Sequence, residues 1–280
     1  MRTFLRVWLS ISAFAIAFGI VIIILAFASG GAYWKDVETY SVNESYDNVS
    51  KIDFNIPYGE VNIQVGDTFS VDAKNLVQDD FQSYVTDGTW YIEENATDKF
   101  SIFGIRLSLR QLCNWNNEFT PKITITIPEG FVAEDFNLQV GAGDVKADSI
   151  SSVKGYFNVD AGRLSINQLS ITDKSQYSVG AGEMVLQDVA INDITLDCGV
   201  GNILIDGVVT GNNDISCGVG GVELDINGKD SDYSYDISSG IGNVEIDGNK
   251  YHNLNESTNN EAVNKLTLDC GIGNITVDFN

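Results

Sequence analysis

The sequence has few of the residues from which catalytic and nucleic-acid-binding sites are built. Its 280 residues include one histidine, three prolines and four cysteines, and 16 Lys and Arg stand against 39 Asp and Glu, a formal net charge of −23. Phosphate repels so acidic a chain, which excludes a nucleic-acid partner. His252 lies in an Asn-rich stretch without a nearby Ser or Cys nucleophile motif, so neither a catalytic triad nor a His-ligated zinc site is expected.

The one long apolar run lies near the N-terminus. Arg2 and Arg6 precede an uncharged stretch from Val7 to Ala28, which as an α-helix would be about 33 Å long and would span a bilayer core. The arginines predict a single-pass protein of the cytoplasmic membrane, with its N-terminus inside and the remainder outside. The alternative is a secreted protein cleaved near Ala28, where the sequence fits a small-x-small cleavage pattern, but the length of the run favours a retained anchor.

Glycine is abundant, and much of it belongs to one short phrase of the type Val-Gly-Ala-Gly or Cys-Gly-Val-Gly. The phrase occurs seven times between Gln139 and Phe279, with last glycines 19, 20, 19, 19, 22 and 31 residues apart. These corner glycines are Gly143, Gly162, Gly182, Gly201, Gly220, Gly242 and Gly273. A near-constant period of this size is typical of a solenoid. We therefore predict an all-β, single-stranded, right-handed β-solenoid with coils of about 19–20 residues.

The apolar residues of each coil alternate on both sides of the phrase, but the alternation slips by one residue at Gly201-Asn202. We expect the chain to turn a corner there and to need a residue that tolerates unusual dihedral angles. Two columns of aligned residues are apolar throughout and are both expected to point inward. The first is Ala142, Ala161, Ala181, Val200, Val219, Ile241 and Ile272, and the second is Val145, Leu164, Met184, Ile203, Val222, Val244 and Ile275.

The rest of the chain divides at changes of pattern. Residues 1–30 form the cytoplasmic N-terminus and transmembrane helix, 31–50 a polar tether, and 51–280 the extracytoplasmic solenoid. Tyr58-Gly59 resembles the later phrase, so the solenoid is expected to begin near residue 51. A polar loop at 249–264 accounts for the longest interval between phrases.

An apolar insertion at 97–117 breaks the rhythm of the repeats. Ile105, Leu109, Leu112 and Trp115 make it a candidate partner patch, and an apolar patch on an acidic rod would suit a protein or a membrane. The favoured interpretation is a capping element that closes the open end of the core, as terminal repeats require.

Three of the four cysteines share one inward column. Cys198 and Cys217 are expected to be neighbours in the stack, and the coil of Ser239 is expected to separate Cys217 from Cys270. In-register side chains keep their Cβ atoms near 4.8 Å, whereas a disulfide requires about 3.8 Å. We therefore predict buried, reduced thiols.

These features together resemble a known family. The N-terminal apolar run, the Ile-Thr-Ile-Pro-Glu-Gly of residues 125–130 and the repeated Gly-Ala-Gly-Asp-Val or Gly-Val-Gly-Asn-Ile phrases are similar to the bacterial putative-adhesin family of unknown-function β-solenoid domains, also likened to the toastrack domains of cell-envelope stress systems. The resemblance covers roughly residues 50–279 and implies a bacterial solenoid that lies at the cell surface or faces the periplasm. It supplies no functional residues, because the motif is structural.

Other functional patterns are poorly matched. A dinucleotide fingerprint needs a strand, a glycine turn and a helix, whereas each phrase here leads into further strand. Calcium-binding β-rolls repeat every nine residues, not every 19 or 20, so no metal ligands are assigned, although weak divalent-ion binding by the acidic surface stays open. Asp197 and Asp269 share an outward position and keep a carbohydrate-active β-helix enzyme as a remote alternative.

We accordingly expect a protein without enzymatic activity, cofactor or metal. It would act as a membrane-anchored binding or scaffolding module of the cell envelope, with an envelope protein or a glycan as partner. A surface adhesin that binds a glycan or a protein is the first alternative. Clustered outward aromatic residues would favour a glycan-binding function, and a converging acid pair would favour the enzyme.

Overall fold

The computed structural model describes residues 39–77, 81–94, 99–102, 105–108, 120–251 and 262–280. Apart from one short 3-10 helix, the secondary structure in these ranges is strand, which confirms the all-β prediction. Within them, no helix has the length and hydropathy needed to cross a membrane. The apolar run 7–28 lies outside the described residues.

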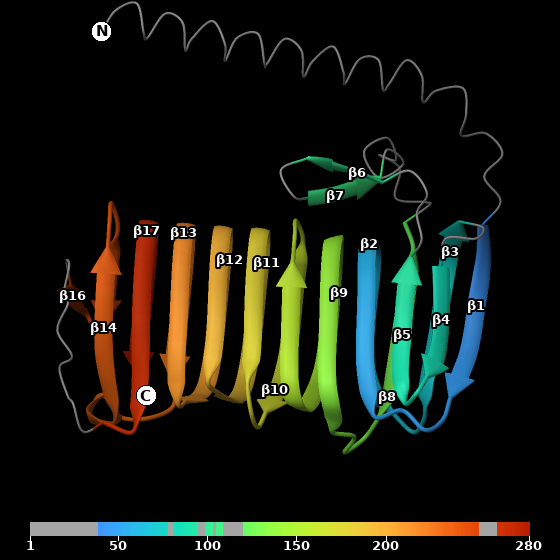
Figure 1. Cartoon of the computed structure of the whole chain (residues 1–280), viewed down its shortest axis with the longest axis horizontal. Coiled ribbons are helices and arrows are strands. Elements are labelled where there is room, and N and C mark those ends of the chain that lie inside the picture. Colours follow the sequence, from blue (N-terminus) through green and yellow to red (C-terminus); the bar gives the residue numbers. More distant parts are fainter. Residues whose placement is uncertain (1–38, 78–80, 95–98, 103–104, 109–119, 252–261) are drawn as a thin grey trace, which may run out of the picture.

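Most strands belong to one 15-stranded sheet, drawn as a row of ribbons in Figure 1. In chain order the elements are β1 (Thr39–Tyr46), β2 (Lys51–Gly66), β3 (Phe69–Val77), β4 (Phe81–Thr86), β5 (Thr89–Glu94), β6 (Lys99–Ile102), β7 (Ile105–Ser108), β8 (Lys122–Pro128), β9 (Ala133–Val159), β10 (Arg163–Ile171), β11 (Ser175–Asn192), β12 (Ile194–Thr210), β13 (Asn212–Ile226), η2 (Asp230–Asp232), β14 (Tyr233–Ser239), β15 (Asn243–Ile246), β16 (Asn249–Tyr251) and β17 (Asn264–Phe279).

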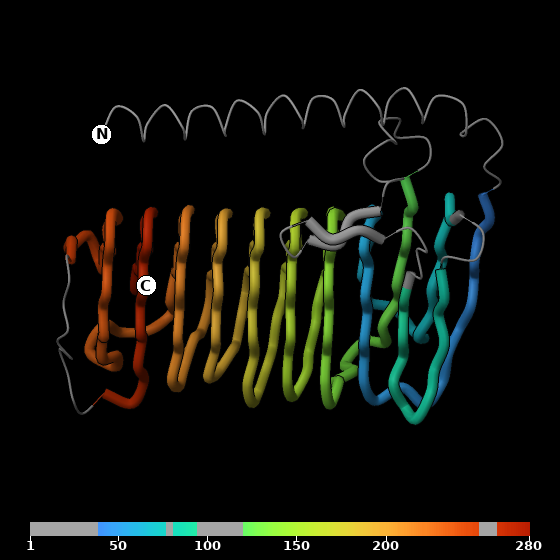
Figure 2. The backbone as a smooth tube through the Cα atoms, turned by 45° about the horizontal axis from the view of Figure 1, so that its top comes forward, coloured from blue at the N-terminus to red at the C-terminus, as the bar shows by residue number. Residues whose placement is uncertain are grey.

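Most coils are one long strand bent near its middle, whereas the coil of Gly162 is divided between β9 and β10 and the terminal coil between β14 and β15. In β12 the buried residues of the first arm are Ile194, Leu196 and Cys198, and those of the second arm include Ile203 and Ile205. Gly199 and Val200 are both exposed, so the alternation slips at the glycine phrase. Figure 2 shows the resulting narrow loops side by side. The bends line one edge, here called the corner edge, and coils pass to the next coil along the opposite joining edge.

Neighbouring coils are parallel and in register. β11 pairs with β12 through Met184↔Ile203, and β12 pairs with β13 through Ile203↔Val222. The second predicted column, from Val145 to Ile275, is buried throughout, so that prediction is confirmed. A residue at one position of the phrase therefore lies directly beside its counterparts in the adjacent coils.

The prediction for the first column is wrong. Its C-terminal members Val200, Val219, Ile241 and Ile272 are exposed, and Ala142, Ala161 and Ala181 are not buried either. The slip occurs before this column and not after it, because Gly199 and Val200 both lie outside the core. The column therefore projects from the bend.

The corner glycines are explained by close approach of backbones. A Cβ atom on Gly201 would lie against the carbonyl oxygen of Gly182 and 3.0 Å from its amide nitrogen. A Cβ on each of the other corner glycines would likewise meet the backbone of the glycine in the neighbouring coil, in the order Gly59, Gly143, Gly162, Gly182, Gly201, Gly220, Gly273 and Gly242. Of the seven predicted corner glycines, only Gly220 has a φ in the left-handed region, at 147°. The expectation of unusual dihedral angles is thus wrong for the others.

The order of the last coils differs from sequence order. β17 pairs with β13 on one side and with β14 and β15 on the other, so Cys217 is the register partner of Cys270 and the Ser239 coil is terminal. The prediction that the Ser239 coil separates these cysteines is wrong. The terminal coil carries Tyr233 and Tyr235, whose rings lie 4.9 and 6.5 Å from that of Phe279, and these bulky residues close the end of the core.

The three thiols of the column are free and buried, as predicted. Burial raises the pKa of each thiol, and that of Cys217 reaches about 11, with further contributions from Cys198. Cys113 lies outside the described residues.

The solenoid begins at β2, where Tyr58 and Gly59 pair with Ala142 and Gly143 of β9. Beyond β2, β5 and β8 continue the two arms, and antiparallel strands β4, β3 and β1 close the end. Residues 39–46 were expected in the polar tether but form β1, because pairing with β3 gives this polar segment a sheet edge to join. Aromatic side chains pack through this end of the core: Trp90, Phe54, Phe136, Phe157 and Tyr177.

The insertion contains the hairpin β6–β7, whose strands pair antiparallel. Ile105 begins β7, and the other residues of the predicted partner patch, Leu109, Leu112 and Trp115, lie outside the described residues.

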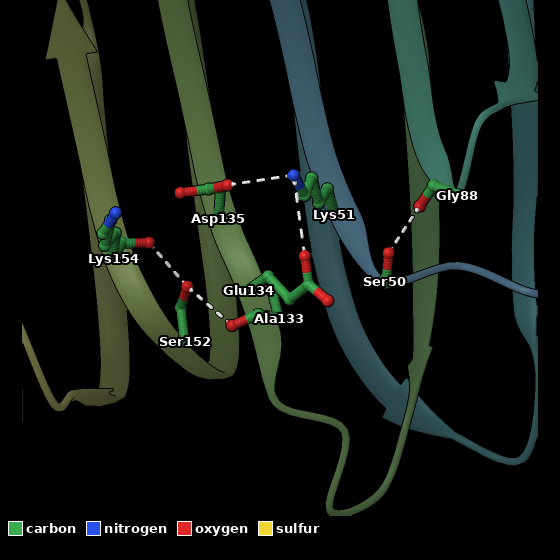
Figure 3. Close-up of polar contacts among 8 residues, drawn as sticks. All are labelled: Ser50, Lys51, Gly88, Ala133, Glu134, Asp135, Ser152 and Lys154. Atoms are coloured by element: carbon green, nitrogen blue, oxygen red, sulfur yellow. Dashed lines mark hydrogen bonds and ion pairs between the residues drawn. The ribbon is translucent and has the colours of Figure 1, made fainter.

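Polar contacts tie coils together along the joining edge (Figure 3). Lys51 lies 3.5 Å from the carboxylates of Glu134 and Asp135, and the buried Ser152 hydroxyl lies 3.1 Å from the Ala133 carbonyl and 2.5 Å from that of Lys154. Near β2 and β9, this edge is therefore cross-linked between neighbouring coils by polar contacts.

Replacing Gly201 by Ala should destabilise the protein by about 1–3 kcal/mol, because the new methyl group meets the Gly182 backbone and has no room to move. Thermal or urea unfolding measures the change. Gly221→Ala is the matched control, since its methyl group would meet only the Asn202 side-chain oxygen at 3.1 Å. Equal melting temperatures for the two variants would contradict the stacked-glycine explanation.

Candidate functional site

Four exposed aliphatic side chains form a row along the corner edge. Val200 is 57 % exposed, Val219 45 %, Ile272 54 % and Ile241 80 %. Val200, Val219 and Ile272 are successive register partners, and Ile241 follows Ile272 because its amide donates to the Gly271 carbonyl in the neighbouring coil. We call these four residues the corner ridge.

Glycines on both sides leave the corner ridge without shielding side chains. In each of these coils the apolar residue stands between two glycines, as Val200 does between Gly199 and Gly201. The first glycine also packs closely, since a Cβ on Gly199 would lie 2.8 Å from the Gly180 carbonyl oxygen. The packing that requires glycine at the bend thus also leaves the side chain between the two glycines exposed to solvent.

The columns that border the ridge carry little charge. On one side lie Asn202, Gly221, Asn274 and Asn243, and on the other Asp197, Ser216, Asp269 and Ser238. Towards β9 the side chains at the ridge position of the same edge are smaller, because they are alanines. The neighbouring positions there carry more charge, such as the exposed ion pair Arg163–Glu183. The apolar surface of the corner edge is therefore concentrated in its C-terminal half.

The two carboxylates that kept the enzyme alternative open, Asp197 and Asp269, do not converge. Asp197 and Asp269 both neighbour Ser216, on opposite sides, which places them two coils or roughly 9.6 Å apart on an open face. No group of metal-binding side chains gathers in the described part of the chain. A hollow of about 40 Å³ lined by Val65, Phe131 and Ile150 has room for a water molecule but not for a sugar ring.

A row of aromatic and polar side chains crosses the N-terminal end of the sheet. Tyr84, Tyr91, Asp53 and Asn137 are register partners on β4, β5, β2 and β9. The two tyrosine rings stack with centroids 5.2 Å apart, and Asn137 Nδ2 donates to Asp53 at 2.8 Å. Asn137 Oδ1 is buried and accepts no hydrogen bond from the described residues. Burial, and then Glu93, raises the pKa of Asp53, while the Asn137 hydrogen bond opposes this.

Sequence reasoning missed this aromatic row. The available signal was the alternation that turns Tyr84 and Tyr91 outward. Their meeting depends on the antiparallel pairing of β4 with β5, which the sequence analysis did not assign.

Three aspartates form a column of like charges on adjacent coils. Asp206, Asp225 and Asp278 are register partners in adjacent coils, where directly opposed like charges are destabilising. Burial raises the pKa of Asp225 above its ordinary 3.8, and Asp278 and Asp206 raise it further.

Asp225→Asn should therefore raise the melting temperature at pH 7. A carboxyl whose pKa is raised by folding costs stability when it is ionised, so the gain should shrink as the pH falls through the raised pKa and vanish below about 3.8. Asp214, whose register partners are Thr195 and Thr267, supplies the control Asp214→Asn. A similar gain from both variants, or a gain that persists in acid, would contradict the repulsion.

Comparison with known proteins gives the family. The model of the Toastrack DUF4097 family matches residues 49–278. No curated protein matches. Similar solved structures include a putative adhesin from Bacteroides fragilis (14% identity, 86% of this chain and 97% of that chain, TM-score 0.46) and a putative cell adhesion protein from Clostridium sporogenes (12%, 87% and 100%, 0.30). A third is a putative adhesin from Parabacteroides distasonis (11%, 88% and 98%, 0.32). With its family model matched over most of its length, the chain belongs to the Toastrack DUF4097 family.

Proposed function

We propose that this protein is a non-enzymatic binding and scaffolding module of the cell envelope. Residues 7–28 anchor it in the cytoplasmic membrane, and the solenoid lies outside. The observation that carries the proposal is the corner ridge: four neighbouring aliphatic side chains exposed on a rod of strongly negative charge. Contiguous exposed apolar surface is typical of an interaction site.

The faces of the rod support the scaffolding part of the proposal. Among the described residues, their side chains form repeated ladders, such as Asp206–Asp225–Asp278, which present the same group at successive coils. A repeat fold presents such surfaces at a fixed spacing along its length, which suits it to hold partners rather than to transform them.

The topology is tested by labelling Asp36→Cys with a membrane-impermeant maleimide on intact cells. Because Arg2 and Arg6 keep the N-terminus inside, position 36 should be labelled from outside, and the protein should stay in the membrane fraction after an alkaline wash. Wild-type protein gives the background from the native cysteines. Protection of position 36, or a mature protein that begins at Ser29 in the medium, would contradict the anchored topology.

Glycan binding is the second candidate function, because the aromatic row provides outward tyrosines beside hydrogen-bonding Asp53 and Asn137. Tyrosine rings pack against the apolar faces of sugars, and carboxylate and amide groups bind their hydroxyls. The detergent-solubilised full chain should then bind members of a panel of peptidoglycan fragments and host oligosaccharides. Tyr84→Ala should lose this binding while Val219→Ser keeps it. A wild-type protein that binds no member of the panel would contradict the glycan function.

A further inference from the structure

We infer that the corner ridge rests on the lipid surface of the membrane that carries the anchor, so that the solenoid axis lies along the membrane plane. This inference rests on the proposed anchoring and names the partner of the ridge. It follows from where the chain enters the fold, from the position of the ridge along the axis and from the chemistry of its neighbours.

The described chain starts on the corner edge. Val42 pairs with Ala73 of β3, Ala73 with Ile123 of β8, and Ile123 with Val61 of β2, so Val42 lies level with a residue just past the bend at Gly59. Thr39, three residues earlier on a strand that runs parallel to β8, lies level with the bend itself. Figure 1 shows the start of β1 and the bends of the coils along the same edge of the sheet.

The connection to the anchor is short. Between Ala28, the last residue of the apolar run, and Thr39 there are 11 residue steps, so the chain reaches at most about 40 Å when fully extended. The anchor thus holds the bilayer within this reach of the corner edge, and the chain enters the fold at the same edge from which the ridge projects.

The ridge lies far from this junction along the axis. In the strand order β1-β3-β8-β2-β9-β10-β11-β12, the coil of Val200 is seven steps from β1, or roughly 34 Å. Val219, Ile272 and Ile241 extend the ridge further from the junction. An anchor at one end and an apolar contact at the other would hold the axis parallel to the membrane.

The size and the composition of the ridge favour lipid over a second copy of this chain as its partner. Four partly exposed side chains present on the order of a few hundred Å², below the roughly 800 Å² that each partner contributes to a stable protein interface. A tethered protein needs less, because the anchor already supplies a high local concentration of membrane. Asp197 and Asp269 border the ridge, so zwitterionic lipid is the better surface.

The test places an environment-sensitive NBD label at Val200→Cys in the full chain, reconstituted as single copies in phosphatidylcholine nanodiscs. Val132→Cys is the matched control: it is also a valine, 54 % exposed, but it adjoins Ala133 on the joining edge. Wild-type protein treated with the reagent gives the background from native thiols. We expect blue-shifted emission at 200 and several-fold stronger quenching by doxyl-labelled lipid at 200 than at 132. Adding Val219→Asn and Ile272→Asn should reduce the quenching at 200 towards that at 132.

Each outcome decides the inference. A full chain that enters the discs but shows equal, weak lipid quenching at both positions would overturn the ridge contact and leave the anchoring intact. Blue-shifted emission without lipid quenching, seen only when a disc holds several copies, would show that a second copy of this chain covers the ridge. That result would also overturn the inferred lipid contact. A full chain that is not retained by the discs would overturn the proposed anchoring and the inference with it.

Discussion

The structure depends on the direct stacking of backbone on backbone at the bend of each coil. From Gly59 to Gly242 the corner glycines lie so close that a single Cβ would meet the carbonyl group of the neighbouring coil. This contact leaves one register available to the coils, because a shift by one residue would bring a side chain into the space that only glycine fits. All other ladders in the molecule follow from that register.

One register produces both the core and the exterior. It aligns the buried column from Val145 to Ile275, and it also aligns Cys198 with Cys217 and Asp206 with Asp225. The effect of a residue at one position is therefore repeated from coil to coil. Apolar side chains in a column pack continuously, whereas carboxylates in a column repel one another. The same geometry exposes the residue between two glycines, which makes the corner ridge a direct consequence of the packing that holds the bend.

The two ends of the rod differ from its middle, because a stack of parallel coils alone would expose core side chains and unpaired strand edges at its first and last coils. Antiparallel strands β1, β3 and β4 close one end, and the terminal coil closes the other with Tyr233 and Tyr235 against Phe279. The N-terminal closure also brings Thr39 to the corner edge. The way the fold is capped thus determines which edge would face a membrane to which it is tethered.

The sequence by itself determined the repeat, the period, the all-β class, the buried column and the buried thiols, because alternation and a fixed glycine spacing are local signals. It did not determine which way the column of Val200 points, since the slip at Gly199 and a slip at Gly201 fit the same apolar pattern. Only the tertiary structure decided that, together with the place of β17 beside β13 and the meeting of Tyr84 with Tyr91. These features depend on pairing between segments that are distant in the sequence. At both ends of the rod, the strands that close the core do not pair in sequence order.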